Sequence, residues 1–252
     1  RQGRAKEALS LFQRALAIRE KALGPEHPNT GTSLNNLAAL YTDMGRYDEA
    51  LPLAQRALAI QEEANGPEHP DTATPLNNLA LLYKGMGRYD QALPLTQRAL
   101  AIREMALGPA HPDTANSLNN LAVLYRAMGR TDVALPLYQR ALAIRERANG
   151  PEHPTIATSL NNLAGLYKSM GRYDQALPLY QRALAMRDKA LGPEHPDTAT
   201  SLNNLAELYQ TMGRHDQALP LYQRTLAIRE KASGPEHPTI ATSLDNLAGV
   251  DQ

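Results

Sequence analysis

The sequence contains no cysteine and no tryptophan, and it has only one phenylalanine among its 252 residues. Without cysteine, the chain can form neither a disulfide nor a thiolate metal site. With few aromatic rings, it offers no obvious platform for stacking the bases of a nucleic acid. The absence of cysteine fits a reducing compartment, and we therefore predict a cytoplasmic location.

The sequence also lacks an excess of either charge. Lys and Arg number 26, as do Asp and Glu, so the formal net charge is zero. A balanced chain gives no reason to expect nucleic acid or an anionic membrane as a partner. No apolar run approaches the ~20 residues that cross a bilayer, and no signal peptide is recognisable. The chain opens in the middle of a sequence pattern, which suggests a fragment.

Familiar catalytic motifs are missing as well. The sequence has no GxSxG, no glycine-rich phosphate loop and no cysteine nucleophile. Most of its polar features recur five or six times, whereas a catalytic site needs unlike residues that converge at one place. We therefore predict that the protein is not an enzyme, with no catalytic residues and no cofactor.

What the sequence does contain is a repeat. The motif GPEHP occupies 24–28, 66–70, 150–154, 192–196 and 234–238, and GPAHP occupies 108–112. Each step is 42 residues, since 66 minus 24 and 108 minus 66 both give 42. Because the period extends over the whole chain, we predict one repeat array over 1–252, without room for a second domain.

Each repeat has the pattern of two helices. In the repeat 30–65, an apolar stripe that includes Leu34 and Tyr41 predicts a helix A, which Gly45 ends as a C-cap. A second stripe, from Ala50 to Ile60, predicts a helix B that stops at the next Gly-Pro. The expected elements are a helix B at 3–23, A/B pairs at 30–65, 72–107, 114–149, 156–191 and 198–233, and a lone helix A at 239–250.

The spacing Leu34-x-x-Leu37-Ala38-x-x-Tyr41, followed by Ala50 and Ala57, resembles the tetratricopeptide repeat. Its 42-residue length resembles the subtype found in kinesin light chains and in many bacterial proteins. The resemblance implies an all-α, superhelical solenoid of antiparallel helix pairs, a bacterial origin, and a peptide-binding groove on the concave wall made by helices A.

Two adjacent asparagines recur in helix A within the string LNNLA. On a helical wheel, the second of them points about 150° away from the core stripe, and so, by the resemblance, toward the groove. Its amide can pair with the backbone of an extended peptide. Alternatively, one asparagine of each pair stitches neighbouring repeats together. The predicted peptide-binding amides are Asn36, Asn78, Asn120, Asn162 and Asn204.

Ligand specificity must come from positions that differ between repeats. Three consecutive repeats carry Lys84, Arg126 and Lys168 near the edge of the predicted groove, and Glu207 marks the far limit of this basic strip. Such a strip favours a ligand with carboxylates. The alternative is an ordinary solvated surface.

Histidine recurs once in each linker, as His27, His69, His111, His153, His195 and His237. Successive histidines lie one repeat apart, too far for the shared ion of a metal site. We therefore predict no metal site and assign the histidines to helix starts.

These observations predict a scaffold that binds a protein or peptide segment, with acidic side chains favoured, in a groove lined by the helix A asparagines. The alternative function is a structural spacer or self-assembling rod. The first helix B lacks a helix A and the last helix A lacks a helix B, so copies of the chain could stack head to tail.

Overall fold

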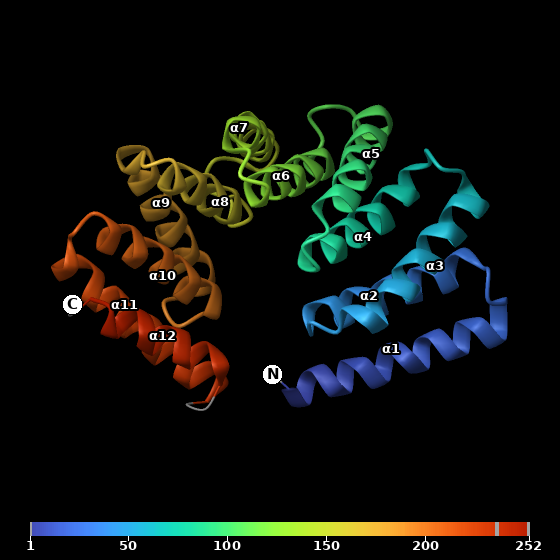
Figure 1. Cartoon of the computed structure of the whole chain (residues 1–252), viewed down its shortest axis with the longest axis horizontal. Helices are drawn as coiled ribbons and strands as arrows, with labels where there is room; N and C mark the ends of the chain where they lie inside the picture. Colours follow the sequence, from blue (N-terminus) through green and yellow to red (C-terminus); the bar gives the residue numbers. More distant parts are fainter. Residues whose placement is uncertain (1, 235–236, 251–252) are drawn as a thin grey trace. The chain divides into compact units, whose positions relative to one another are not determined.

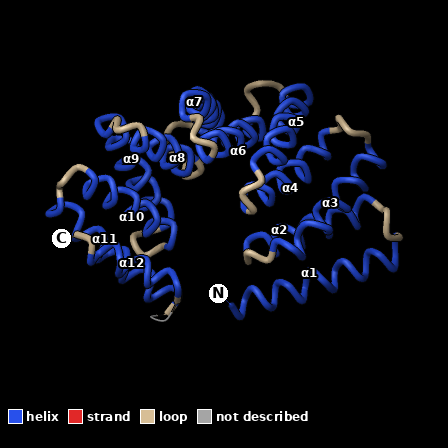
Figure 2. The backbone as a smooth tube through the Cα atoms, viewed as in Figure 1, coloured by secondary structure: helices blue, strands red, loops and turns tan. Residues whose placement is uncertain are grey.

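The computed structural model describes residues 2–234 and 237–250, and within these ranges it contains twelve α-helices, one short 3₁₀ helix and no strand (Figures 1 and 2). The chain divides into two compact units, Arg1–Arg130 and Thr131–Gln252. Unit 1 contains α1 (Gln2–Leu23), α2 (Pro28–Asp43), α3 (Tyr47–Asn65), the 3₁₀ helix η1 (Pro70–Thr72), α4 (Ala73–Gly85), α5 (Tyr89–Leu107) and α6 (Pro112–Ala127). Unit 2 contains α7 (Thr131–Asn149), α8 (Ile156–Ser169), α9 (Tyr173–Leu191), α10 (Pro196–Thr211), α11 (His215–Ser233) and α12 (Pro238–Ala248). The all-α fold of consecutive helix pairs confirms the predicted fold class.

Four of the six linker histidines cap an A helix. His27 lies at the N-cap of α2, where its Nδ1 accepts a hydrogen bond from the backbone N–H of Asn29 at 3.1 Å. Pro28 follows at the first helical position, where a missing N–H costs nothing. The same cap recurs at His111, His195 and His237. At these four positions the histidine has the expected helix-start role, whereas α4 and α8 start three residues or more after their histidine, with Thr72 and Thr155 at the N-cap.

A glycine turn joins the two helices of each repeat. Gly45 takes φ +71°, a conformation that side-chain-bearing residues rarely adopt. The next N–H, of Arg46, donates to the carbonyl of Tyr41 at 2.8 Å, which satisfies one of the last carbonyls of α2. The Arg46 guanidinium also lies 4.6 Å from the centre of the Tyr41 ring. This turn reverses the chain so that α3 packs back against α2.

The core of each repeat lies between its own two helices and the preceding helix B. Leu34 of α2 is fully buried against Ala57 and Ile60 of α3, and Leu202 of α10 is buried against Ile228 of α11 in the same way. The predicted stripe of helix A, Leu34, Leu37, Ala38 and Tyr41, is buried throughout. Helix A therefore presents its remaining face away from this core.

Polar contacts between neighbouring repeats fix their register. Gln55 of α3 donates to the hydroxyl of Tyr83 in α4 at 3.2 Å, and the same bond links Gln97 to Tyr125. Between successive B helices, Arg98 pairs with Glu62 at 2.6 Å. These bonds link each helix B to the helices of a neighbouring repeat.

Candidate functional site

The candidate site is the exposed face of the A helices, here called the helix A wall. Unit 1 has such a wall on α2, α4 and α6, and unit 2 has one on α8, α10 and α12. Of the predicted amides, Asn36 is exposed, and Asn78, Asn120, Asn162 and Asn204 are half-buried. The preceding asparagine is buried in four of the five repeats, as Asn35, Asn77, Asn161 and Asn203, and Asn35 is only 7% exposed.

Several of the asparagines bond across the repeat boundary. The Nδ2 of Asn78 donates to the Oδ1 of Asn35 at 3.1 Å, so it links α4 to α2. In unit 2, the corresponding bonds join Asn204 to Asn161 at 3.4 Å and Asn246 to Asn203 at 3.0 Å. Each of these amides uses one donor for the link, and it keeps a second N–H and a carbonyl oxygen. Stitching is therefore part of the role of the second asparagine, as well as of the first.

The hydrogen bond between two asparagines is missing between α4 and α6. The buried Oδ1 of Asn77, which Asn120 would reach by analogy, has no hydrogen-bond partner within the described part of the chain. A cavity of about 10 Å³ lies here, lined by Asn77, Thr96 and Asn120. Thr96 of α5 occupies the position that is equivalent to Tyr138 of α7. Within unit 1, Asn36 and Asn120 are thus the wall amides whose donors are not committed to a neighbouring repeat.

The basic positions fall into two different environments. In unit 1, Lys84 is half-buried and Arg126 is exposed, and no ion pair of either is found among the described residues. Burial lowers the pKa of Lys84 below its ordinary value, and the nearby charge of Arg126 lowers it further. In unit 2, Lys168 pairs with Glu207 at 2.8 Å. Lys84 and Arg126 therefore lie together as uncompensated cations, whereas the charge of Lys168 is neutralised.

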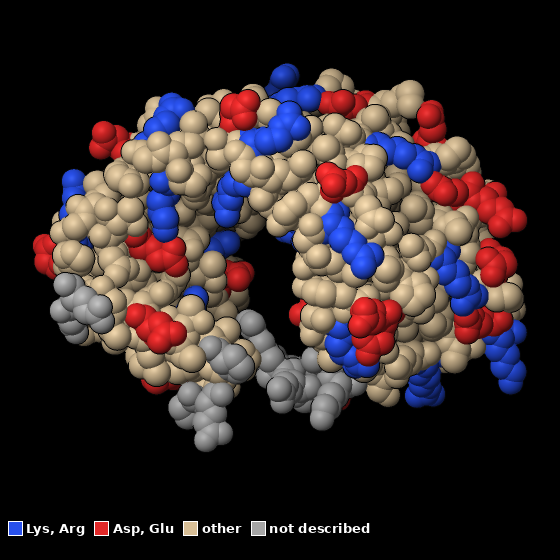
Figure 3. Space-filling model, viewed as in Figure 1, with Lys and Arg blue, Asp and Glu red and all other residues tan. Residues whose placement is uncertain are grey.

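Elsewhere the charges are mixed. Lys and Arg side chains are interspersed with Asp and Glu side chains on the face of each unit drawn in Figure 3. The two cations of unit 1 are a local feature in a neutral chain.

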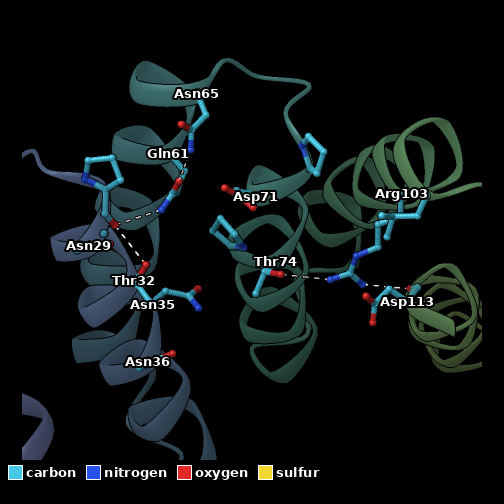
Figure 4. Close-up of a pocket in the computed structure, with 15 residues that line it drawn as sticks. Asn29, Thr32, Asn35, Asn36, Gln61, Asn65, Asp71, Thr74, Arg103 and Asp113 are labelled. Carbon is cyan, nitrogen blue, oxygen red and sulfur yellow. Dashed lines mark hydrogen bonds between the residues drawn. The ribbon is translucent and has the colours of Figure 1, made fainter. Parts of the chain in front are cut away.

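A large cavity opens in unit 1 beside the first turns of α2, α4 and α6 (Figure 4). Its volume is about 640 Å³. Asn36, Gln61 and Asn65 line one part of it, and Asp71 and Arg103 line another. The repeat pattern does not predict this cavity, although one signal for it is present in the sequence. Gln61 and Pro75 are the exceptions at positions that hold arginine and serine in the other repeats.

Neither a metal site nor a membrane span is found in the part of the chain that the structure describes. In the described ranges 2–234 and 237–250, no three His, Asp or Glu side chains are grouped so that they could hold a metal ion. None of the described helices combines the length and the apolar character needed to span a membrane.

The tetratricopeptide repeat model matches the chain in six overlapping segments, which are residues 1–63, 32–105, 71–147, 113–189, 155–231 and 197–252. Among solved structures, a putative kinesin light chain of Podosopora anserina with nearly identical TPR-like repeats is 31% identical, with a TM-score of 0.66. The match covers 82% of this chain and 98% of that one. BtubC (BKLC) of P. vanneervenii is 25% identical, with a TM-score of 0.72, over 93% of this chain and 94% of that one. Comparison with curated proteins gives no match.

The bond between Asn78 and Asn35 predicts a difference between two matched substitutions. Asn78→Ala leaves the Oδ1 of the buried Asn35 without its donor, which costs about 1 to 3 kcal/mol of unfolding free energy. Asn36→Ala removes an exposed amide and changes stability by no more than about 0.5 kcal/mol. Both variants gain the same helix propensity, so chemical denaturation of the two isolates the bond. Equal unfolding midpoints would show that the link contributes nothing.

Proposed function

Because the chain belongs to the tetratricopeptide-repeat family and has repeats like those of kinesin light chains, we propose that it holds an extended peptide of a partner protein along the helix A wall. Members of this family are interaction scaffolds without catalytic activity, and their repeats bind proteins or peptides. The finer proposal concerns which side chains make the contacts and which ligand chemistry they favour.

The wall amides are the proposed contacts to the peptide backbone. An amide offers two donors and an acceptor, which match the alternating carbonyl and N–H groups of an extended chain. In unit 1, Asn36 and Asn120 carry donors that no described residue of a neighbouring repeat uses, and Asn78 lies in the same row. Asn162 and Asn204 hold the corresponding positions in unit 2. Contacts to main-chain groups give affinity with little sequence preference, so selectivity has to come from other residues.

The cations of unit 1 are the proposed source of selectivity. Arg126 is close enough to Lys84 for its charge to lower the pKa of Lys84, and neither has a counter-ion in the described residues. A ligand carboxylate placed between them relieves this repulsion and accepts charge-assisted hydrogen bonds. This unpaired couple is the single observation that carries the preference for an acidic peptide. Lys168 contributes less, because Glu207 already pairs with it.

Removing both cations should weaken the binding of an acidic peptide. We expect Lys84→Gln with Arg126→Gln to lower the affinity for a glutamate-rich peptide at least tenfold, because each charge-assisted hydrogen bond contributes about 1.5 to 3 kcal/mol. Isothermal titration calorimetry measures the change. The control is Arg14→Gln with Lys21→Gln, which removes the same charge from exposed positions on α1. An equal loss in both double variants would indicate a non-specific charge effect and contradict the proposal.

The lowered pKa of Lys84 predicts how binding depends on pH. The ammonium attracts a carboxylate only below the pKa of Lys84, which lies under the ordinary 10.5. Affinity for the acidic peptide should therefore fall as pH rises from neutrality toward 10.5. The glutamates of the peptide stay ionised over this range. Affinity measured against pH tests this, and Lys84→Arg should flatten the curve. A fall that persists in Lys84→Arg would assign the dependence to another group.

A second candidate function, a self-assembling rod, is supported by two exposed residues. Ile18 of α1 is 56% exposed, whereas its counterpart Ile60 is 1% exposed. Leu244 of α12 is 48% exposed, whereas its counterpart Leu34 is fully buried against Ile60. Leu244 of one copy set against Ile18 of the next would recreate the Leu34–Ile60 contact. Such a head-to-tail contact generates open chains of copies rather than closed rings.

Sedimentation velocity over a concentration series tests this association. We expect the sedimentation coefficient to rise with concentration in the native protein and to stay at the monomer value for Ile18→Asp, because the aspartate places a charge in the apolar contact. Lys21→Asp on the same helix should behave like the native protein. A constant monomer value for the native protein up to about millimolar concentration would exclude the rod, since that corresponds to less than about 4 kcal/mol of association free energy.

A further inference from the structure

We propose that the 640 Å³ cavity of unit 1 binds the guanidinium group of an arginine side chain from a partner protein. This site goes beyond the proposed function, because a guanidinium could enter the cavity whether or not the wall amides hold a peptide backbone.

The other repeat junctions show the chemistry of the site, because each encloses an arginine of its own. Arg103 of α5 donates to the Oγ of Ser117 at 2.9 Å, to the carbonyl of Asp113 at 3.4 Å, and to the Oγ1 of Thr74 at 3.3 Å. Arg103 is half-buried, and this burial lowers its pKa. The junction therefore tolerates a desolvated guanidinium because it supplies three oxygens as acceptors.

The same arrangement recurs along the chain. Arg187 of α9 donates to Ser201 at 2.9 Å, to the carbonyl of Asp197 at 2.9 Å, and to Thr158 at 3.3 Å. The further arginine–serine pairs are Arg19 with Ser33, Arg145 with Ser159, and Arg229 with Ser243. A guanidinium at this place is thus a regular part of the repeat.

The junction between α3 and α4 lacks that guanidinium. Gln61 stands at the arginine position, and its Nε2 turns back to the carbonyl of Pro28 at 3.2 Å. Asn65 donates to the Oε1 of Gln61 at 2.9 Å and so holds it in this orientation. Figure 4 shows both amides on the α2 side of the cavity, with Asp71 and Thr74 across from them.

Pro75 replaces the serine that accepts the hydrogen bond of the arginine at the other junctions. It stands at the serine position, so it brings no hydroxyl into the junction. It also has no N–H to donate to the carbonyl of Asp71, four residues earlier. The α-helix accordingly starts only at Ala73, after the 3₁₀ turn Pro70–Thr72. The Asp71 carbonyl is the counterpart of the Asp113 carbonyl, which accepts a hydrogen bond from Arg103. It lacks two donors that its equivalents have, which are the backbone N–H that Pro75 does not carry and the guanidinium that Gln61 replaces.

The remaining acceptors fit an external guanidinium. Thr32 is the counterpart of Thr74, and its Oγ1 donates to Pro28 at 3.2 Å, which leaves its lone pairs for a donor. The charged residues that line the cavity are Asp71, Asp113 and Arg103, so two negative charges and one positive charge give a net charge of −1. Arg103 is already bonded to Thr74, Asp113 and Ser117. Carbonyl, hydroxyl and carboxylate oxygens together suit the planar fork of five N–H donors, and they suit the smaller set of an ammonium less well.

The test uses a glycine peptide with a single central arginine, titrated into the ¹⁵N-labelled protein and followed by NMR. We expect saturable shifts of the Gln61 and Asn65 side-chain amides. The same peptide with lysine should bind more weakly, and the peptide with citrulline, which is neutral and of the same shape, should not bind in the cavity. Gln61→Arg with Pro75→Ser fills the cavity with the residues of the other junctions, and it should reduce the affinity for the arginine peptide at least tenfold.

Two controls make the outcome decisive. The filled variant should melt no lower than the native protein, because five other junctions carry the same pair, and it should keep its affinity for a glutamate-rich peptide, because Lys84 and Arg126 are unchanged. The reverse change in unit 2, Arg187→Gln with Ser201→Pro, should create a second site for the arginine peptide. The proposal is overturned if the native protein shows no saturable shifts up to millimolar peptide, if the filled variant binds equally well, or if citrulline replaces arginine without loss.

Discussion

Each helix pair of this chain can bury its apolar stripe only against the helices that flank it in sequence. This constraint follows from the 42-residue period, because every repeat presents the same stripe and there is no separate core to join. Leu34 packs on Ile60 within one repeat, and Leu202 packs on Ile228 within another. The outer face of each helix A takes no part in this packing and stays available to a ligand. The position of the candidate binding surface therefore follows from the packing of the core.

The same constraint places polar groups at the junctions, where they must be satisfied locally. Asparagines, glutamines and arginines at the junctions bond to a neighbouring repeat rather than to distant parts of the chain. Where one member of such a set is replaced, its partners cannot find a substitute elsewhere. The cavity beside Gln61 lies where two side chains differ from those of the other repeats, and the unpartnered Oδ1 of Asn77 lies in the repeat that has Thr96 where later repeats have a tyrosine. Variation between repeats therefore creates local features without changing the fold.

The sequence predicted the fold because its signals are local and repeated. Gly45 ends a helix through its own backbone conformation, and His27 and Pro28 start one through contacts two residues away. The candidate site was less accessible, because its properties depend on pairs from different repeats. The wheel placed Asn78 on the outer face of its helix, but it could not show that Asn35 accepts one of its hydrogens. Lys168 looked equivalent to Lys84 until its contact with Glu207, 39 residues later, was known. Gln61 and Pro75 were visible as exceptions, yet each is unremarkable alone.

The arginine–serine contact joins two positions 14 residues apart on either side of a linker, and Gln61 and Pro75 occupy the same two positions. A gain or loss of whole repeats that breaks the chain inside a helix pair keeps both members together. A break within the linker between them would instead join a glutamine to a serine, or an arginine to a proline. A duplication or loss of repeats can consequently preserve or copy the cavity only when Gln61 and Pro75 are transferred together.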